Sequence, residues 1–298
     1  MQMRVDRVGH ATPKRSSWVA NPKRLLRVAG WIVFYAFLAA LGIFMMLPLL
    51  WMVSIASRAL KEVFVQPISL IPKDFQLFPT LVSAMHRLPV LRFYMNSVVI
   101  AVSTTLGQLL FCSLAGFGFS KYNFPGREVV FTIVLSVSMI PFIAIAIPLF
   151  VVVRDLGWLN SYVGLIVPSL VSPFGIFLMR QFIRELPNEL IEAARLDGSS
   201  ELGIYFRIVL PLTKPALATL SIVAFLGSWD SFLWPLLIVN RTELYPLTLG
   251  LGKFQGEHYT VWNELMAVAF ASVLPSLIGY VTLQRYFVKG IVMTGIKG

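Results

Sequence analysis

The amino-acid sequence predicts an all-α integral membrane protein with six transmembrane helices and a polar, two-helix loop on the cytoplasmic side. Apolar residue types make up 57% of the 298 residues and charged types 13%, which is about half the charged share of an average soluble domain. Charged residues are absent from long stretches, such as residues 28–57 and 93–120. Because roughly 20 apolar residues cross a bilayer core about 30 Å thick, these stretches exclude a water-soluble domain.

Six apolar segments have the length of membrane spans. Helices are expected in all of them, because the alternating pattern of a transmembrane strand is absent and a helix bonds every backbone polar group within its own segment. The expected spans are 28–54, 94–119, 129–153, 161–181, 213–239 and 262–284. The first span follows a basic leader that reaches Arg27 and is longer than the apolar core of a signal peptide, so we expect a retained anchor.

The distribution of Lys and Arg sets the expected orientation. With the N-terminus inside, the inner segments carry 17 of these residues and the outer segments carry 8, five of them in the outer loop 55–93. An excess of basic residues marks the cytoplasmic side, so both termini are expected in the cytoplasm. The chain then divides into a basic cytoplasmic segment at 1–27, a transmembrane domain at 28–284 and a cytoplasmic tail at 285–298. Four prolines predict an irregular cap for the outer loop 55–93.

Composition also excludes several classes of function. The net charge of +11 lies beside the spans rather than along one soluble face, so orientation explains it better than binding to nucleic acid. Cys112 is the only cysteine and the three histidines are far apart in the sequence, so neither a disulfide nor a metal site is expected. We expect no catalytic residue, because the spans hold no nucleophile with a base, and no cofactor bound by this chain.

The inner loop 182–212 is a polar interruption between spans, with five acidic residues. Pro187 suits the first position of a helix, and acidic residues follow near the positive end of that helix. Gly198 suits the left-handed conformation that ends a helix. Ser199 can cap a second helix. The apolar body of this second helix is expected to be Ile204, Phe206, Ile208 and Leu210.

The first of these two helices has the features of a docking surface. The small side chains of Ala193 and Ala194 would let the backbone of another protein come close, and Glu192 offers a carboxylate to an arginine of that partner. The alternative is a pair of amphipathic helices that touches only lipid headgroups, but five acids oppose contact with anionic lipid.

The residues of this loop resemble a known family. EAARLDG at 192–198 and FRIVLPLTKPA at 206–216 are similar to the signature loop of permease subunits in binding-protein-dependent ATP-binding-cassette (ABC) importers. The resemblance extends through AGFGFSKYNFPG at 115–126, SWDSFLWPLL at 228–237 and the terminal QRYFVKGIVMTGIKG. These segments resemble the sugar-importing branch typified by the maltose importer, whose permeases have the type I fold. Ser199 departs from the family pattern, which often has Ala at that place.

The resemblance implies a transport subunit rather than an enzyme. It implies a bacterial inner-membrane complex with a second related permease, two ATPase subunits that bind ATP and Mg, and an extracytoplasmic solute-binding protein that delivers a carbohydrate. This chain has no phosphate-binding loop of the form G-x-x-x-x-G-K-[ST]. The coupling residues implied by position are Glu192, Ala193, Ala194, Asp197 and Gly198. The alternatives are another solute, such as glycerol phosphate, or a secondary transporter, which the lack of an internal repeat opposes.

Several residues are candidates for the path of the transported solute. Asp230 is the only acidic residue in the middle of an expected span, where an ionisable group is costly unless it faces a cavity or a partner. It contacts either the solute or the companion permease. Trp229 and Trp234 either stack on sugar rings or serve as packing and anchors. The further polar candidates are Asn96, Gln108 and Ser172. The spans hold no Lys or Arg between their ends, which favours a neutral solute.

Two further segments are candidates for contacts with partners. The outer loop 240–261 contains Gly250, Gly252 and Gly256 and resembles the loop that reaches into the sugar-binding protein. Without that contact, it would be a simple connector. The flexible basic tail 285–298 is expected to contact lipid and, from the resemblance, the ATPase dimer.

Overall fold

The computed structural model describes residues 22–65, 70–256 and 259–295, with side chains between residues 27 and 282. Within these ranges the regular elements are helices, and the isolated bridge between Gln255 and Thr260 is the extended pairing there. The chain forms two units, residues 1–50 and 51–298. The first 21 residues of the expected basic segment lie outside the described residues.

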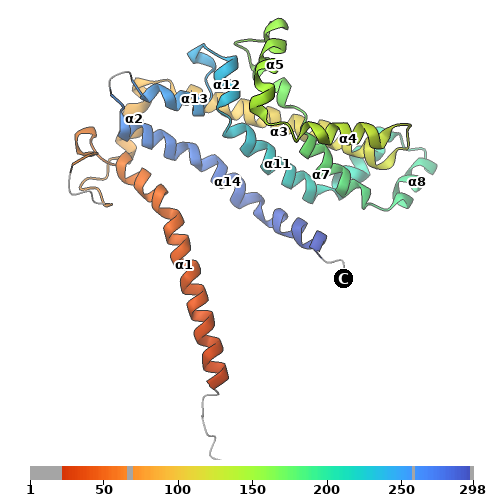
Figure 1. Cartoon of the computed structure of the whole chain (residues 1–298), viewed down its shortest axis with the longest axis horizontal. Coiled ribbons are helices and arrows are strands. Elements are labelled where there is room, and N and C mark those ends of the chain that lie inside the picture. The colour runs from red at the N-terminus through yellow and green to blue at the C-terminus, as the bar shows by residue number, and fades with distance from the viewer. Residues whose placement is uncertain (1–21, 66–69, 257–258, 296–298) are drawn as a thin grey trace, which may run out of the picture. The chain divides into compact units, whose positions relative to one another are not determined.

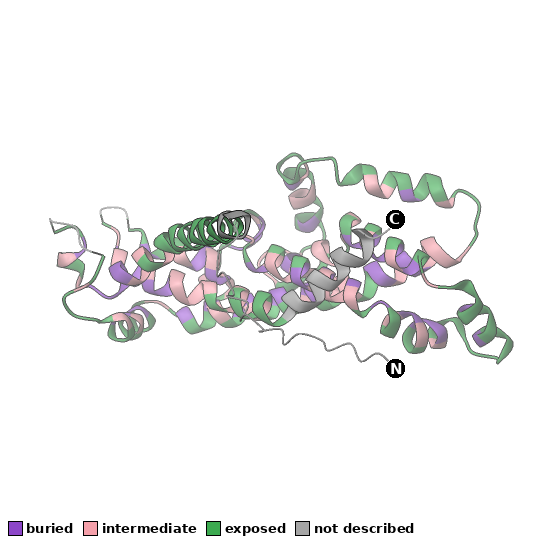
Figure 2. Cartoon of the chain, turned by 90° about the horizontal axis from the view of Figure 1, so that it is seen from below, coloured by how far each residue is buried: buried purple, intermediate pink, exposed green. Residues whose placement is uncertain are grey.

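The first unit contains most of helix α1 (Pro22–Ala56). Between residues 27 and 50 every residue except Leu49 is exposed, and Figure 2 shows this helix as exposed along its length. A helix that is apolar all round and buries nothing within its own chain has the surface of a lipid-facing span. Trp31, Phe34 and Tyr35 pack together near its beginning, as aromatic residues do at a membrane interface.

The second unit is built around the long helix α3 (Val90–Lys121), which packs against α7 (Pro173–Arg184) and α11 (Lys214–Trp229). Helix α11 also packs on α14 (Trp262–Gly295), and α14 packs on α2 (Leu77–Arg87) (Figure 1). Helices α3 and α7 approach closely because a Cβ at Gly116 would lie 2.7 Å from the Cβ of Met179. Small residues of this kind allow helices to pack in a bilayer.

Among the described residues, three helices are long and apolar enough to cross a membrane by themselves. The number rises to the expected six if each of three bent helix pairs is counted as one span. Helices α4 (Arg127–Val137) and α5 (Phe142–Asp155) meet at 102°, so the expected span 129–153 consists of two helices rather than one. Helix α6 (Tyr162–Ile166) continues as η2 (Val167–Ser169) and bends by 43° into α7. Prolines stand at the start of the second helix in these pairs, Pro141 and Pro173, and proline cannot continue a preceding helix.

The first half of the third bent pair is the second helix of the inner loop 182–212. Helix α9 (Glu201–Ile204), the π-helical turn η3 (Tyr205–Val209) and helix α10 (Leu210–Leu212) meet α11 at 82°. Helix α11 ends at Trp229, and a separate short helix α12 (Leu233–Ile238) follows. The expected fifth span 213–239 is therefore wrong in its second half.

The outer segments are more regular than expected. The segment 55–93 contains η1 (Leu60–Glu62) and the amphipathic helix α2, so the expectation of an irregular cap is wrong. The segment 240–261 contains η4 (Thr242–Leu244), α13 (Leu247–Leu251) and η5 (Gly252–Phe254). Helix α14 runs through Gly295, past the expected end at Gln284, so the described part of the tail is helical rather than flexible. The tail's side chains lie outside the described set.

Candidate functional site

The inner loop forms a helix, a sharp turn and a second helix, as its sequence predicts. Helix α8 (Asn188–Leu196) begins after Pro187, and Gly198 follows it with a φ of +80°. Only glycine adopts this conformation without steric cost. The cap of α9 is Ser200, whose hydroxyl accepts a hydrogen bond from Gly203 N at 3.2 Å. The assignment of this cap to Ser199 is therefore wrong by one residue.

One face of this loop belongs to the core of the second unit. Ile191, Ala194 and Ile204 are buried there. Ala194 therefore packs inside its own chain and does not offer the small surface that its type predicted. Tyr205 and Val209 are buried, whereas Phe206 is exposed. The predicted apolar body is thus wrong at Phe206, because residues at alternate positions point to different sides of a helix.

The opposite face of the loop is exposed. Glu192, Ala193, Asp197 and Gly198 are exposed. Leu196, which the motif reading did not single out, is 90% exposed, and Leu202 is 63% exposed. Large apolar side chains standing out of a polar loop mark a surface that a partner covers.

Polar contacts hold this loop at the end of α3. Arg195 Nε donates to Glu201 Oε1 at 2.7 Å, and the hydroxyl of Tyr122 donates to the same carboxylate. These bonds, led by the one from Arg195, hold the pKa of the Glu201 carboxyl below its ordinary value. Lys121 Nζ donates to Asn188 Oδ1 at 2.7 Å. Both helices of the loop are therefore fixed to the last residues of α3.

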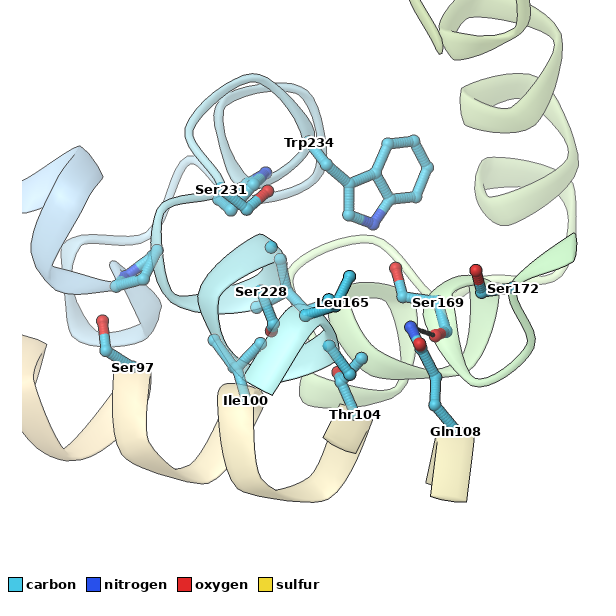
Figure 3. A pocket seen from close by; sticks show the side chains of 15 residues that line it. Ser97, Ile100, Thr104, Gln108, Leu165, Ser169, Ser172, Ser228, Ser231 and Trp234 are labelled. Atoms are coloured by element: carbon cyan, nitrogen blue, oxygen red, sulfur yellow. Dashed lines mark hydrogen bonds between the residues drawn. The ribbon is translucent and has the colours of Figure 1, made fainter. Parts of the chain in front are cut away.

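A polar pocket of about 260 Å³ lies between α3, the segment 165–172, α11 and the segment that follows α11 (Figure 3). Hydroxyl groups dominate its polar lining, together with one amide and one indole. The residues that carry these groups are Ser97, Thr104, Gln108, Ser169, Ser172, Ser228, Ser231 and Trp234. The amide Nε2 of Gln108 donates to the carbonyl oxygen of Ser169 at 2.9 Å, as the dashed line in Figure 3 shows.

Three of the predicted path residues line this pocket, namely Gln108, Ser172 and Trp234. The other three do not. The amide of Asn96 donates to the carbonyls of Glu243 and Tyr245 and accepts from the hydroxyl of Tyr162, so it holds the fold.

Trp229 and Asp230 also lie away from the pocket lining. Trp229 is buried against Phe225 and donates to the carbonyl of Ser272, which supports the packing role. Asp230 is exposed and caps the C-terminal end of α11. Its expected place in the middle of a span is wrong, because the helix stops one residue earlier.

The glycines predicted to meet a binding protein differ in their surroundings. A Cβ at Gly250 would lie 2.3 Å from Cδ2 of Phe93, so this glycine serves close packing. Gly252 has open space around its Cα, and Gly256 is exposed.

The sequence reasoning missed the pocket residues Ser97, Thr104, Ser169, Ser228 and Ser231. A signal was present on α3, where Ile100, Thr104 and Gln108 recur at intervals of four and lie on one face of a helix. Serine and threonine in spans are usually read as bonded within their helix. Among the described residues, no group of three His, Cys, Asp or Glu side chains could hold a metal ion.

The described residues thus form an all-helical integral-membrane domain with a fixed, exposed polar loop. The chain belongs to the family described as binding-protein-dependent transport system inner membrane component, whose family model matches residues 108–293. It is thus an inner-membrane permease of the ABC transporter type.

Its relatives transport sugars and related solutes. The chain is 37% identical over 207 residues to the arabinooligosaccharides transport system permease protein AraQ of Bacillus subtilis, with 70% of this chain and 74% of the relative covered. It is 34% identical over 265 residues to the sn-glycerol-3-phosphate transport system permease protein UgpE of Escherichia coli O1:K1, with 85% and 92% covered.

A solved structure shares the fold along nearly the whole chain. A chain of a bacterial ABC transporter involved in the import of the acidic polysaccharide alginate superposes with a TM-score of 0.79 at 26% identity, covering 89% of this chain and 98% of that one. A second structure of an alginate transporter, in complex with a pentasaccharide-bound periplasmic protein, matches with a TM-score of 0.58 at 17% identity over 85% and 92% of the two chains.

Proposed function

We propose that this chain is the permease subunit of an ATP-driven importer that passes a carbohydrate from a solute-binding protein into the cytoplasm by alternating access. In this proposal a second, related permease completes the path. Two separate ATPase subunits bind ATP and Mg and perform the hydrolysis. The observation that carries the proposal is the exposed EAARLDG loop, fixed to the end of α3 in a chain of the ABC permease family.

The loop has the form that a docking element needs. Glu192 and Asp197 present carboxylates to solvent, and Leu196 presents an apolar side chain beside them. The fully exposed Leu196 would fill an apolar cleft on the ATPase, and the carboxylates would pair with basic residues around that cleft. Because Arg195 and Lys121 tie the loop to α9 and to α3, a displacement of the loop would be passed to the long helix that borders the pocket.

The proposed orientation places this loop and both termini in the cytoplasm. The 17 to 8 distribution of Lys and Arg supports it. On the outer side, Gly252 has open space around it and Gly256 is exposed, which leaves the segment after α13 free to meet the binding protein. We propose that the C-terminal tail meets the ATPase dimer, which deletion of residues 294–298 tests directly. Transport that stays unchanged after this deletion would overturn that contact.

Glycerol phosphate is the second candidate cargo, because the relative of Escherichia coli is named for its transport. A phosphate group calls for Lys or Arg along the path, since an unpaired charge is costly to bury. The fifteen residues that line the pocket include no charged side chain, which favours the carbohydrate.

The experiment is reconstitution of the complex in proteoliposomes with its companion permease, its ATPases and its binding protein. We expect ATP hydrolysis that rises when the binding protein carries a saccharide. Glu192→Ala and Leu196→Ala should each lower this stimulation at least fivefold while the permease pair still assembles. The matched control is Leu190→Ala, since Leu190 is 45% exposed on the same helix but lies outside the motif. Full stimulation in both motif variants would refute the coupling assignment.

A further inference from the structure

Four of the hydroxyl groups that line the polar pocket make no hydrogen bond within the described residues. Thr104 is 2% exposed, and its Oγ1 has no hydrogen-bond partner in the described chain. Its neighbour Thr105 donates to the carbonyl of Ala101 at 2.7 Å. Both residues have the same chemistry on the same helix, yet only the one that lines this pocket is unpaired.

The same contrast appears on the facing segments. Ser221 of α11 donates to the carbonyl of Ala218 at 2.8 Å, and Thr219 donates to that of Pro215. The hydroxyls of Ser169, Ser228 and Ser231, which line the pocket, make no hydrogen bond within the described residues. Of the four, Thr104 and Ser228 lie in α-helices, where a hydroxyl can bond the carbonyl three or four residues earlier. Four unpaired hydroxyls around one cavity therefore point to a ligand that carries many hydrogen-bonding groups.

The remaining polar groups are held in place by the fold. Ser97 Oγ accepts from the backbone N–H of Leu247 at 2.7 Å, which leaves its own proton to donate. The indole Nε1 of Trp234 donates to the carbonyl of Gly164 at 3.1 Å, and its ring packs edge-on against Phe142. Trp234 is thus a fixed aromatic wall, and the apolar face of a sugar ring packs well on such a surface.

Charge and size narrow the class of ligand. No Asp, Glu, Lys, Arg or His lines the pocket, so a phosphate or a carboxylate would be buried without a counter-charge, at high cost. Neutral hydroxyls both donate and accept, and they match the hydroxyls of a sugar. The volume of about 260 Å³ is below the usual range for a drug-sized ligand, which suits one sugar unit rather than a whole oligosaccharide.

We propose that this pocket, within this single chain, binds one uncharged sugar unit of the cargo through Thr104, Ser169, Ser228 and Ser231. The proposal rests on the proposed import function and extends it, because it assigns the cargo to the uncharged saccharides and excludes glycerol phosphate and uronate chains from this subsite. Binding would give these four hydroxyls hydrogen-bond partners on the sugar.

The test compares two variants with two matched controls in the reconstituted complex. Thr104→Val and Ser228→Ala remove unpaired hydroxyls of the pocket, whereas Thr105→Val and Ser221→Ala remove hydroxyls that bond their own helix. The substrates offered are neutral oligosaccharides from partial hydrolysates of arabinan and starch, together with glycerol 3-phosphate and oligoguluronate. Mass spectrometry identifies what accumulates inside the vesicles, and the thermal midpoint of each variant is measured without substrate.

We expect neutral oligosaccharides to accumulate, and their uptake to fall about three- to tenfold in each pocket variant, as loss of a hydrogen bond predicts. The controls should transport normally. Thr104→Val should also keep or raise the thermal midpoint, because it removes a buried hydroxyl without a partner. If the Thr104 hydroxyl only stabilised the fold, its removal would lower the thermal midpoint.

Uptake of the charged substrates alone, or of no neutral oligosaccharide, would overturn the inference. Equal uptake in pocket variants and controls would also overturn it, since the pocket would then hold water only. These outcomes are separate from the proposed function, because stimulation of ATP hydrolysis by the loaded binding protein reports that function independently.

Discussion

The hydroxyl of Tyr205 lies 2.7 Å from the hydroxyl of Ser113, and both residues are buried. Tyr205 begins the π-helical turn of the inner loop 182–212, which is the coupling loop of the proposed function, and Ser113 lies on α3. Ser113 Oγ also donates to the carbonyl of Leu109, so the tyrosine is the donor in this pair. The bond joins this loop to the helix that carries Thr104 and Gln108.

Tyr205→Phe should remove the hydrogen bond between the loop and α3 without opening a cavity. A single neutral hydrogen bond contributes about 1 kcal/mol to stability, so the thermal midpoint of the complex should fall by a few degrees. The ratio of sugar transported to ATP hydrolysed should fall further, because the loop then moves with less effect on α3. Tyr35→Phe, at an exposed tyrosine of α1, is the control. If the ratio of sugar transported to ATP hydrolysed is the same in Tyr205→Phe and the wild type, this bond has no role in coupling.

Arg180 fixes the C-terminal half of α7 to α4 and to α3. Its guanidinium donates to Glu128 Oε1 at 2.6 Å and to the carbonyl of Phe119 at 3.2 Å, and it lies 3.8 Å over the ring of Phe131. Arg180→Lys keeps the charge but loses the planar fork, so it should not restore stability. We expect Arg180→Gln to cost about 1–3 kcal/mol, since the buried guanidinium makes a charge-assisted bond that the amide cannot replace.

The control for this prediction is Arg154→Gln. Arg154 pairs with Asp155 at 2.9 Å, but both side chains are more than half exposed, and such pairs contribute about 0–1 kcal/mol. Unfolding of the purified complex in denaturant measures both variants. Equal losses in the two would contradict the role given to Arg180.

Glu264 clamps α14 to α2 on the side opposite the coupling loop. It is 3% exposed, accepts from Arg87 Nε at 2.6 Å and accepts from Ser83 Oγ at 2.7 Å. Glu264→Gln keeps the shape but removes the charge, so we expect a loss of about 1–3 kcal/mol from the weakened bond to Arg87. Limited proteolysis of the 55–93 segment should become faster. Glu243→Gln, at an exposed pair with 3.9 Å separation, should leave the rate unchanged.

The ion pair in the coupling loop predicts a dependence on pH. Arg195 and Tyr122 lower the pKa of Glu201 from its ordinary value of 4.5. A depressed folded pKa contributes stability above the unfolded value, and this contribution is lost as the pH falls through the folded pKa. The difference in thermal midpoint between the wild type and Glu201→Gln should therefore be constant from pH 7 to 5 and shrink below 4.5. A difference that grows on acidification would contradict this assignment.

Much of the fold could be predicted from local sequence. Long runs without charge predicted where the chain meets lipid, and the left-handed φ of Gly198 followed from its place after EAARLD. The spans that contain Pro141 and Pro173 were each expected as one helix, whereas the structure divides each of them into two helices that meet at an angle. Proline marks a break, whereas the angle across it depends on what each half packs against.

The sequence by itself determined that this chain is an all-helical membrane protein with a polar loop of the ABC permease type. Only the tertiary structure decided that Ala193 is exposed and Ala194 buried, and that Thr104 lines a pocket while Thr105 bonds its own helix. Adjacent residues of a helix point about 100° apart, and packing against α7 and α11 selects which of them faces inward. Two neighbouring residues of the same type therefore cannot be assigned to the buried or the exposed side from their type alone.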